Sequence, residues 1–185
     1  AELGRLGATI VDVPLPALEW ASRMGGTLTS TEAAAYHGAR IRRDGHLYDQ
    51  RTRLRIESGM FISAETYHQT QRLRSMVGQK LAETFREVDL LATPTMPMPA
   101  LPQSVGVGDT DLAGQLWPAS SLMTRLTQIF NVNGHPALSA PCGFSSNGLP
   151  LALQLVGRPF EDALVLRAAH AYQQATDWHE RRPVF

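Results

Sequence analysis

Residues 131–157 contain the pattern that most limits how this chain folds. Two short apolar runs, 137–140 and 151–156, are bounded by glycine and proline, and Asn147-Gly148 lies between them. Bounded apolar runs of this length predict strands, and Asn-Gly is a turn signal. Side chains of the second run alternate between two faces of a strand: Leu151, Leu153 and Leu155 on one face, Ala152, Gln154 and Val156 on the other. The segment therefore predicts two strands joined by a turn, the second with one fully packed face.

Other segments predict further strands and helices. A strand is expected near residues 8–13, ending at Pro14 and Pro16, because proline cannot donate to a strand ladder. Thr29 and Glu32 have the spacing of a capping box, which predicts that a helix starts there. A second helix is expected over residues 64–88, with a buried stripe formed by Leu73, Val77, Leu81, Phe85 and Val88.

The second half of the chain continues this alternation. Residues 89–92 predict a short strand, residues 103–118 an irregular loop that lines or covers a substrate entrance, and residues 116–130 a helix. Gly134 lies where this helix turns into a strand and is expected to adopt a left-handed backbone. The closing helix, over about 161–176, is expected to bury Leu164, Ala168, Ala171, Tyr172 and Ala175.

Composition and charge exclude several classes of function. The chain has 185 residues, 43% of them hydrophobic and 18% charged, which is typical of a soluble globular protein with one domain. Seventeen basic residues balance seventeen acidic ones, so nothing predicts binding to nucleic acid or to an anionic membrane. No signal peptide is visible and Cys142 is the single cysteine, so a disulfide framework is excluded and a cytoplasmic location is expected.

No metal or cofactor is expected. The six histidines do not pair with Cys or carboxylates at a metal-binding spacing, and the glycines form neither a dinucleotide-binding nor a phosphate-binding motif. Cys142 lies at a strand end with no partner specified by the sequence, which favours a small packing residue over a nucleophile.

The block from Asn131 to Gly157 resembles the C-terminal part of the amidase signature family, which has the patterns N-x-x-G-x-P-A-x-S-x-P-x-G and G-L-P-x-x-x-Q-x-x-G there. Residues 89–95 upstream and 160–172 downstream keep the family's order, and the resemblance begins near Gly7. It implies an α/β fold with a mixed β-sheet sandwiched by helices, of which residues 1–185 are only the C-terminal part of a single domain. The strands would lie near 8–13, 89–93, 137–142 and 150–157.

The resemblance implies a catalytic machinery that these residues do not contain. Family members hydrolyse or transfer amides with a Ser nucleophile, a second Ser in a cis peptide and a Lys base, and both serines lie in a Gly-Ser-rich segment. Ser120-Ser121 and Ser145-Ser146 lack the flanking glycines, and Lys80 is the only lysine and lies in a polar helix pattern. We therefore expect no catalytic residue in this chain. Its parent would be an amidase acting on a small-molecule amide, with the N-terminal part of the same enzyme as partner, and the chain alone would be inactive.

Three residues are candidates for substrate binding by the same resemblance. Arg55 stands four residues before Gly59, where glutamine-dependent members use an arginine to hold the substrate carboxylate. Either it binds an acidic amide or it is structural. Thr127 and Asn131 match the family's Thr-x-x-x-Asn segment behind the active site, and Asn131 is expected to support the site, because an amide is not a base at neutral pH.

Two alternative functions remain open. One is a subunit of a glutamine-dependent tRNA amidotransferase. Two departures weigh against it: Thr124 stands where such subunits have an aspartate, and residues 32–37 differ from their Glu-Ala-Ser-Ser-Asn-Leu segment. The other is a truncated, non-catalytic binding or assembly module. A homodimer also remains open, because a part of a sheet would expose strand edges and apolar faces.

Overall fold

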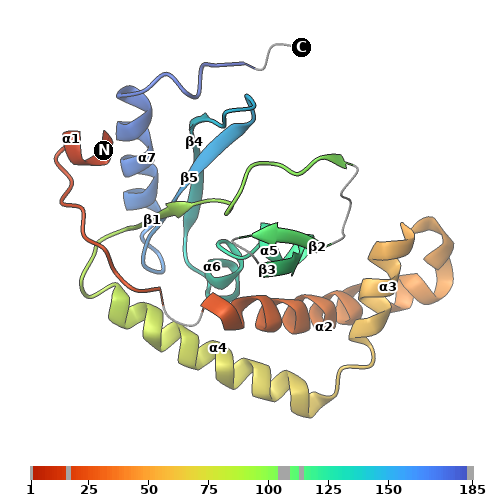
Figure 1. Ribbon diagram of the computed structural model, residues 1–185. Coiled ribbons are helices and arrows are strands. Elements are labelled where there is room, and N and C mark those ends of the chain that lie inside the picture. Colours follow the sequence, from red (N-terminus) through yellow and green to blue (C-terminus); the bar gives the residue numbers. More distant parts are fainter. Residues whose placement is uncertain (1, 16–17, 104–108, 113–114, 183–185) are drawn as a thin grey trace.

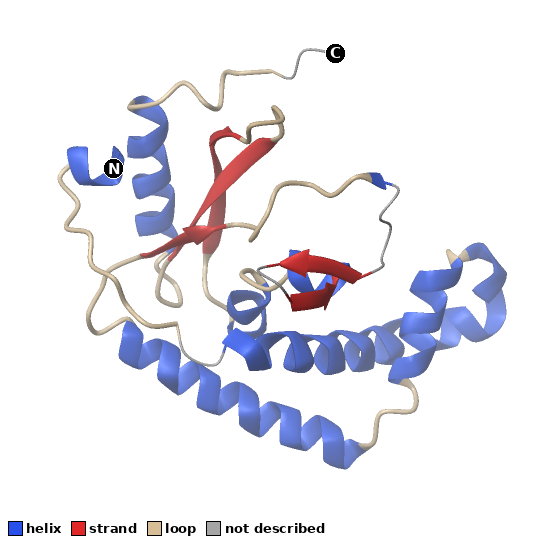
Figure 2. Ribbon diagram, in the orientation of Figure 1, coloured by secondary structure: helices blue, strands red, loops and turns tan. Residues whose placement is uncertain are grey.

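The computed structural model describes residues 2–15, 18–103, 109–112 and 115–182 (Figures 1 and 2). The long helices lie in the first half of the chain and most strands in the second half. The helices are α1 (Glu2–Arg5), α2 (Leu18–Asp44), α3 (Gln50–Gly59), α4 (Ala64–Thr84), α5 (Ala119–Met123), α6 (Gln128–Asn133) and α7 (Asp162–Gln174), with a 3-10 turn, η1 (Gly45–Leu47). The strands are β1 (Leu91–Pro94), β2 (Asp109–Leu112), β3 (Gln115–Pro118), β4 (Ala137–Phe144) and β5 (Pro150–Val156).

The main sheet has the order β1-β5-β4, and its described strand pairs are antiparallel. Val156 of β5 lies opposite Leu91 of β1 on one side and Ala137 of β4 on the other. The predicted strands near 89–93, 137–142 and 150–157 are thereby confirmed. The turn between β4 and β5 is closed by a bond of 2.8 Å from the amide of Ser145 to the carbonyl of Leu149, with Gly148 at a φ of 75°.

Helix α7 lies along one face of this sheet, and α2, α4 and α6 pack at the end of the sheet that carries Leu91 and Val156 (Figure 1). On one face Leu155 of β5 packs with Val165 and Ala169 of α7. On the other face Val156 packs into a core with side chains from α2, α4 and α6. That core contains Ala21, Met24, Val77, Leu81, Phe85, Leu91, Ile129 and Phe130. Leu155 and Val156 of β5 pack on opposite sides, as the alternation predicts, but Leu151 and Leu153 are only half-buried, so the fully packed face expected for this strand is not observed. The stripe expected over 64–88 is buried at its three central positions, although α4 ends at Thr84.

Two predictions for the first half of the chain are wrong. Residues 8–13 form no strand, and Ile10 and Val11 are 63% and 52% exposed. A strand requires a partner, and the described residues offer none at this position. The helix expected to start at Thr29 already begins at Leu18, because Ala21, Met24 and Leu28 bury one face at helical spacing.

The second half contains two further corrections. The helix expected over 116–130 is divided into β3, α5, a turn at 124–127 and α6, and β2 pairs with β3 inside the segment expected to be an irregular loop. Residues 104–108 and 113–114 of that loop lie outside the described residues. In α7 the buried side chains are Val165, Ala169 and Tyr172. Tyr172 belongs to the expected stripe, whereas Val165 and Ala169 each lie one residue after an expected position. Both stripes have helical spacing, and the contact with the sheet selects between them.

The described helices include none that is both long enough and apolar enough to cross a membrane.

Candidate functional site

The segment with Thr127 and Asn131 is held in one conformation by local bonds. Thr127 precedes α6, and its hydroxyl donates to the carbonyl of Thr124 at 3.3 Å. Gly134 ends α6 with a φ of 72°, which confirms its predicted left-handed backbone, and the amide of His135 donates to the carbonyl of Phe130. Asn131 therefore lies on the exposed surface of a short helix that is fixed at both ends.

A buried glutamine ties this segment to the sheet. Gln154 of β5 is only 3% exposed, and its amide nitrogen donates to the hydroxyl of Thr93 at 2.9 Å and to the carbonyl of Leu126 at 3.0 Å. Both bonds lie in the core, where an unpaired amide would be costly. Gln154 thus positions the start of α6 against β1 and β5. Its signal in the sequence is a polar residue inside an otherwise apolar strand.

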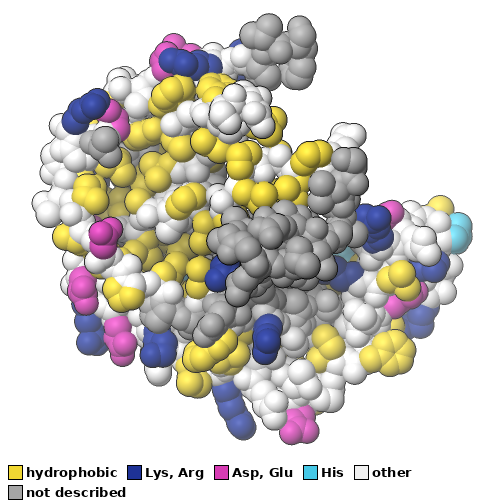
Figure 3. Space-filling model, in the orientation of Figure 1, with side chains coloured by type: hydrophobic (Ala, Val, Ile, Leu, Met, Phe, Trp, Pro, Cys, Tyr) yellow, Lys and Arg dark blue, Asp and Glu magenta, His cyan; other side chains and the backbone are white. Residues whose placement is uncertain are grey.

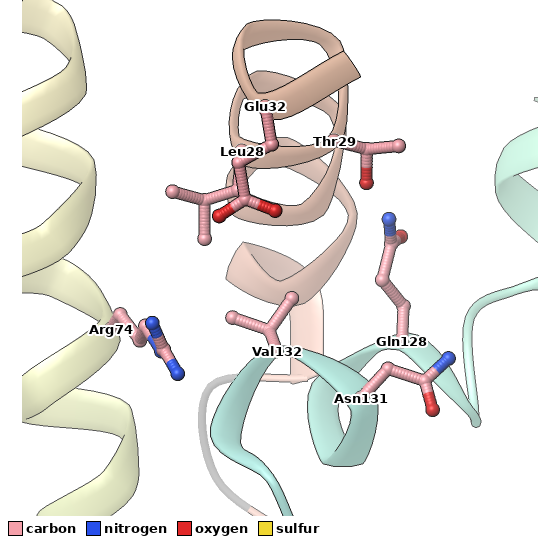
Figure 4. Close-up of a pocket in the computed structure, with 7 residues that line it drawn as sticks. All are labelled: Leu28, Thr29, Glu32, Arg74, Gln128, Asn131 and Val132. Carbon is pink, nitrogen blue, oxygen red and sulfur yellow. The ribbon is translucent and has the colours of Figure 1, made fainter. Parts of the chain in front are cut away.

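Asn131 lines a polar pocket of about 210 Å³ between three helices (Figure 4). The lining consists of Leu28, Thr29 and Glu32 from α2, Arg74 from α4, and Gln128, Asn131 and Val132 from α6. The pocket brings together two charged side chains, those of Glu32 and Arg74, that no sequence pattern predicted as neighbours. Thr127 is not part of this lining, although it lies one turn from Asn131.

Arg55 lies apart from the other two candidates. Its side chain is exposed on α3, and its backbone carbonyl accepts a hydrogen bond of 2.8 Å from the hydroxyl of Ser58. Helix α3 packs against α2, with Gly59 directly over the backbone of Ser30. The structure therefore places Arg55 on a separate helix and does not bring it into the lining of the polar pocket.

A second, apolar cleft of about 950 Å³ lies beside the sheet. It is formed by β1, the methionine- and proline-rich residues 95–100, and side chains of β4, β5, α7 and the N-terminal residues. Hydrophobic side chains gather around the sheet and α7 in the space-filling view (Figure 3). Among the polar groups of the cleft, the hydroxyls of Thr95 and Ser139 lie 2.8 Å apart and hydrogen-bond to each other. Most of the lining is apolar, so the cleft is suited mainly to apolar contact.

Cys142 and the serines fit supporting roles. Burial raises the pKa of the Cys142 thiol above its ordinary value, so the protonated form, which is not the nucleophile, dominates at neutral pH. The hydroxyl of Ser145 accepts a hydrogen bond from the amide of Leu149 at 3.1 Å and thereby stabilises the β4–β5 turn. Lys80 is half-buried on α4, and no described cluster of three or more His, Cys, Asp or Glu side chains could hold a metal.

Comparison with known proteins gives consistent results. The family model described as Amidase matches residues 1–166. A curated amidase from Pseudomonas putida is 36% identical over 188 residues, which cover 98% of this chain and 39% of that protein. A glutamyl-tRNA(Gln) amidotransferase subunit from Chloroflexus aggregans is 36% identical over 200 residues, covering 96% of this chain and 39% of that protein.

Solved structures share the fold. A crystal structure of an amidase aligns with a TM-score of 0.83 at 26% identity, over 94% of this chain and 39% of that chain. The chain thus spans about two fifths of the length of the curated relatives and of the solved structure that it matches.

Proposed function

This chain belongs to the amidase signature family, and from that premise we propose that it forms the C-terminal part of an enzyme that hydrolyses the carbon–nitrogen bond of a small amide. The proposal rests on the similarity of this chain to amidases in both sequence and fold. Nearly the whole chain aligns with an amidase at 36% identity and with a solved amidase fold.

Amide hydrolysis requires groups that this chain does not supply. A nucleophile attacks the carbonyl while a base accepts its proton, and donors stabilise the oxyanion. The C–N bond then breaks as the amine takes that proton and leaves, and water hydrolyses the acyl-enzyme. In our proposal a Ser-Ser-Lys site in the N-terminal part of the enzyme performs these steps. Residues 1–185 complete the sheet and contribute one wall of the substrate cleft, with Thr127 and Asn131 supporting it.

The apolar cleft supports the proposed partner. Its lining is largely apolar. Covering this apolar surface and the neighbouring sheet edge with further chain would remove them from water and stabilise the protein. We infer that the N-terminal part of the same enzyme packs there.

A tRNA-dependent amidotransferase is a second candidate function. The 36% identity to a subunit of such an enzyme favours it, whereas Thr124 and residues 32–37 depart from the pattern of those subunits.

The test compares the full-length enzyme with residues 1–185 alone. The full-length enzyme should hydrolyse small amides and lose this activity when a serine-directed covalent inhibitor reacts with it. The isolated chain should show no hydrolysis above background. Hydrolysis by the isolated chain, or an acyl adduct on one of its side chains, would contradict the proposed division of roles.

Arg55 is tested separately in the full-length enzyme. If Arg55 holds a substrate carboxylate, Arg55→Gln should raise KM about tenfold or more for amides that carry a carboxylate and leave neutral amides unchanged. Arg51→Gln, which changes another exposed arginine on the same helix, is the control and should change neither KM. Equal KM changes for both kinds of amide would assign Arg55 a structural role.

A further inference from the structure

The polar pocket between α2, α4 and α6 holds two opposite charges that do not neutralise each other. Glu32 projects from α2 toward α6, and the guanidinium of Arg74 projects from α4 into the same space (Figure 4). Within the described part of the chain, no ion pair joins the two side chains. Each charge is therefore available to a group of opposite sign on a ligand.

The other polar groups of the pocket are equally available. Arg74 makes one long hydrogen bond, of 3.5 Å, to the side-chain oxygen of Gln71. The carboxylate of Glu32 and the amides of Gln128 and Asn131 have no hydrogen-bond partner among the described side chains and backbone groups. An amide both donates and accepts, so Gln128 and Asn131 add both kinds of hydrogen bond to the two charges of the lining.

Packing of the helices brings the walls of the pocket close together and keeps it small. The side chain of Gln128 lies across Gly25 of α2, where a Cβ atom would collide with it. Leu28 and Val132 supply apolar wall between the polar groups. A volume of about 210 Å³ is below the range of about 300–1,000 Å³ typical of pockets for drug-sized ligands. The size suits a molecule with few non-hydrogen atoms.

We propose that this pocket binds a small free amino acid as a zwitterion. The carboxylate of the ligand pairs with Arg74, whose planar guanidinium binds carboxylates through two parallel bonds. Its ammonium group pairs with Glu32, its short side chain contacts Leu28 and Val132, and Gln128 bonds the remaining polar atoms. This proposal does not depend on amide hydrolysis, because it concerns binding alone.

The experiment is equilibrium dialysis of the full-length protein against labelled L-alanine. Binding should saturate with one site, and propionate and ethylamine, which each carry one of the two charges, should compete at least tenfold more weakly than L-alanine. Arg74→Gln and Glu32→Gln should each weaken binding at least tenfold. Arg72→Gln and Glu83→Gln, which change exposed charges on α4 away from the pocket, should leave it unchanged.

Circular dichroism of each variant shows whether it is folded, and only folded variants are compared. The proposal is overturned if L-alanine shows no saturable binding to the full-length protein. It is also overturned if the one-charge analogues compete equally well, or if the Arg72 and Glu83 variants lose binding as the pocket variants do. Loss of amidase activity with retained alanine binding would contradict the proposed function and leave this inference standing.

Discussion

At the scale of single residues, Gly59 controls how closely two helices approach. It is buried at the end of α3, and a Cβ atom there would lie against the carbonyl oxygen of Ser30 in α2, which is backbone and cannot rotate away. The close contact between α2 and α3 therefore depends on the absence of a side chain.

Gly59→Ala should destabilise the protein by about 1–3 kcal/mol, the range for overpacking a tight contact. The control is Gly26→Ala in α2, where a Cβ atom meets nothing within 4 Å and where alanine is the better helix former. Urea unfolding should show a lower midpoint for the first variant and an equal or higher midpoint for the second. Equal midpoints for both variants would contradict the close-approach argument.

Asp49 makes the stability of α3 depend on pH. Its carboxylate caps the helix, and hydrogen bonds, foremost that from the backbone amide of Thr52, lower its pKa below the ordinary value of 3.8. The pKa is lower in the folded than in the unfolded state, so this stabilisation is complete above about pH 4 and is lost as the pH falls through the depressed pKa.

Asp49→Asn keeps a capping oxygen but removes the charge. The wild-type protein should therefore lose more stability than the variant between pH 5 and pH 2, measured as the shift of the urea midpoint. Parallel pH profiles for the two proteins would show that the charge of Asp49 does not contribute.

At the scale of elements, the central question is what holds α6 against the sheet. Gln154 bonds both β1 and the turn before α6, and it is the one buried side chain described here that joins these three elements by hydrogen bonds. The position of Asn131 and of the polar pocket therefore depends on a residue that touches neither.

Gln154→Leu should cost about 1–3 kcal/mol, because it leaves the hydroxyl of Thr93 and the carbonyl of Leu126 without their donor. Gln174→Leu, an exposed change of the same chemistry on α7, should stay within about 0.5 kcal/mol. Thermal or urea unfolding measures both changes. A cost for Gln154→Leu no larger than that of the control would show that these bonds are replaced by water.

Prediction from the sequence succeeded where local chemistry decides the structure. Pro136 precedes β4, Pro150 and Gly157 bound β5, and the left-handed Gly134 ends α6, so these features were predictable, whereas β4 continues past Pro141 and Gly143 to Phe144. Residues 8–13 failed because a strand depends on a partner elsewhere in the chain. The approach of Glu32 to Arg74 was not predictable either, since helix packing alone brings these distant residues together.

At the scale of the whole molecule, the apolar cleft should make the isolated chain behave differently from the longer enzyme that we propose. Met98 lines the cleft and Met76 lies half-exposed on α4 outside it. If further chain covers the cleft, a charge at Met98 is tolerated by the isolated chain but would be buried in the longer protein.

Met98→Glu should lower the thermal midpoint of the full-length protein by several degrees and leave that of residues 1–185 nearly unchanged. Met76→Glu should have little effect in either. An equal response of the two proteins to Met98→Glu would mean that the cleft stays open to solvent and that the proposed packing partner lies elsewhere.

The flanking of β5 by β1 and β4 has an evolutionary consequence. The chain leaves the sheet after Pro94 and returns at Ala137, and both neighbours are held by the same central strand. Within this stretch, α6 contributes Ile129 and Phe130 to the core, but β2 and β3 pair with each other and not with the described strands of the main sheet, so insertions, deletions and exchanges in the β2–β3 segment leave the register of the main sheet intact. The β2–β3 segment is therefore the part of this stretch whose length can change during evolution without the framework being rebuilt.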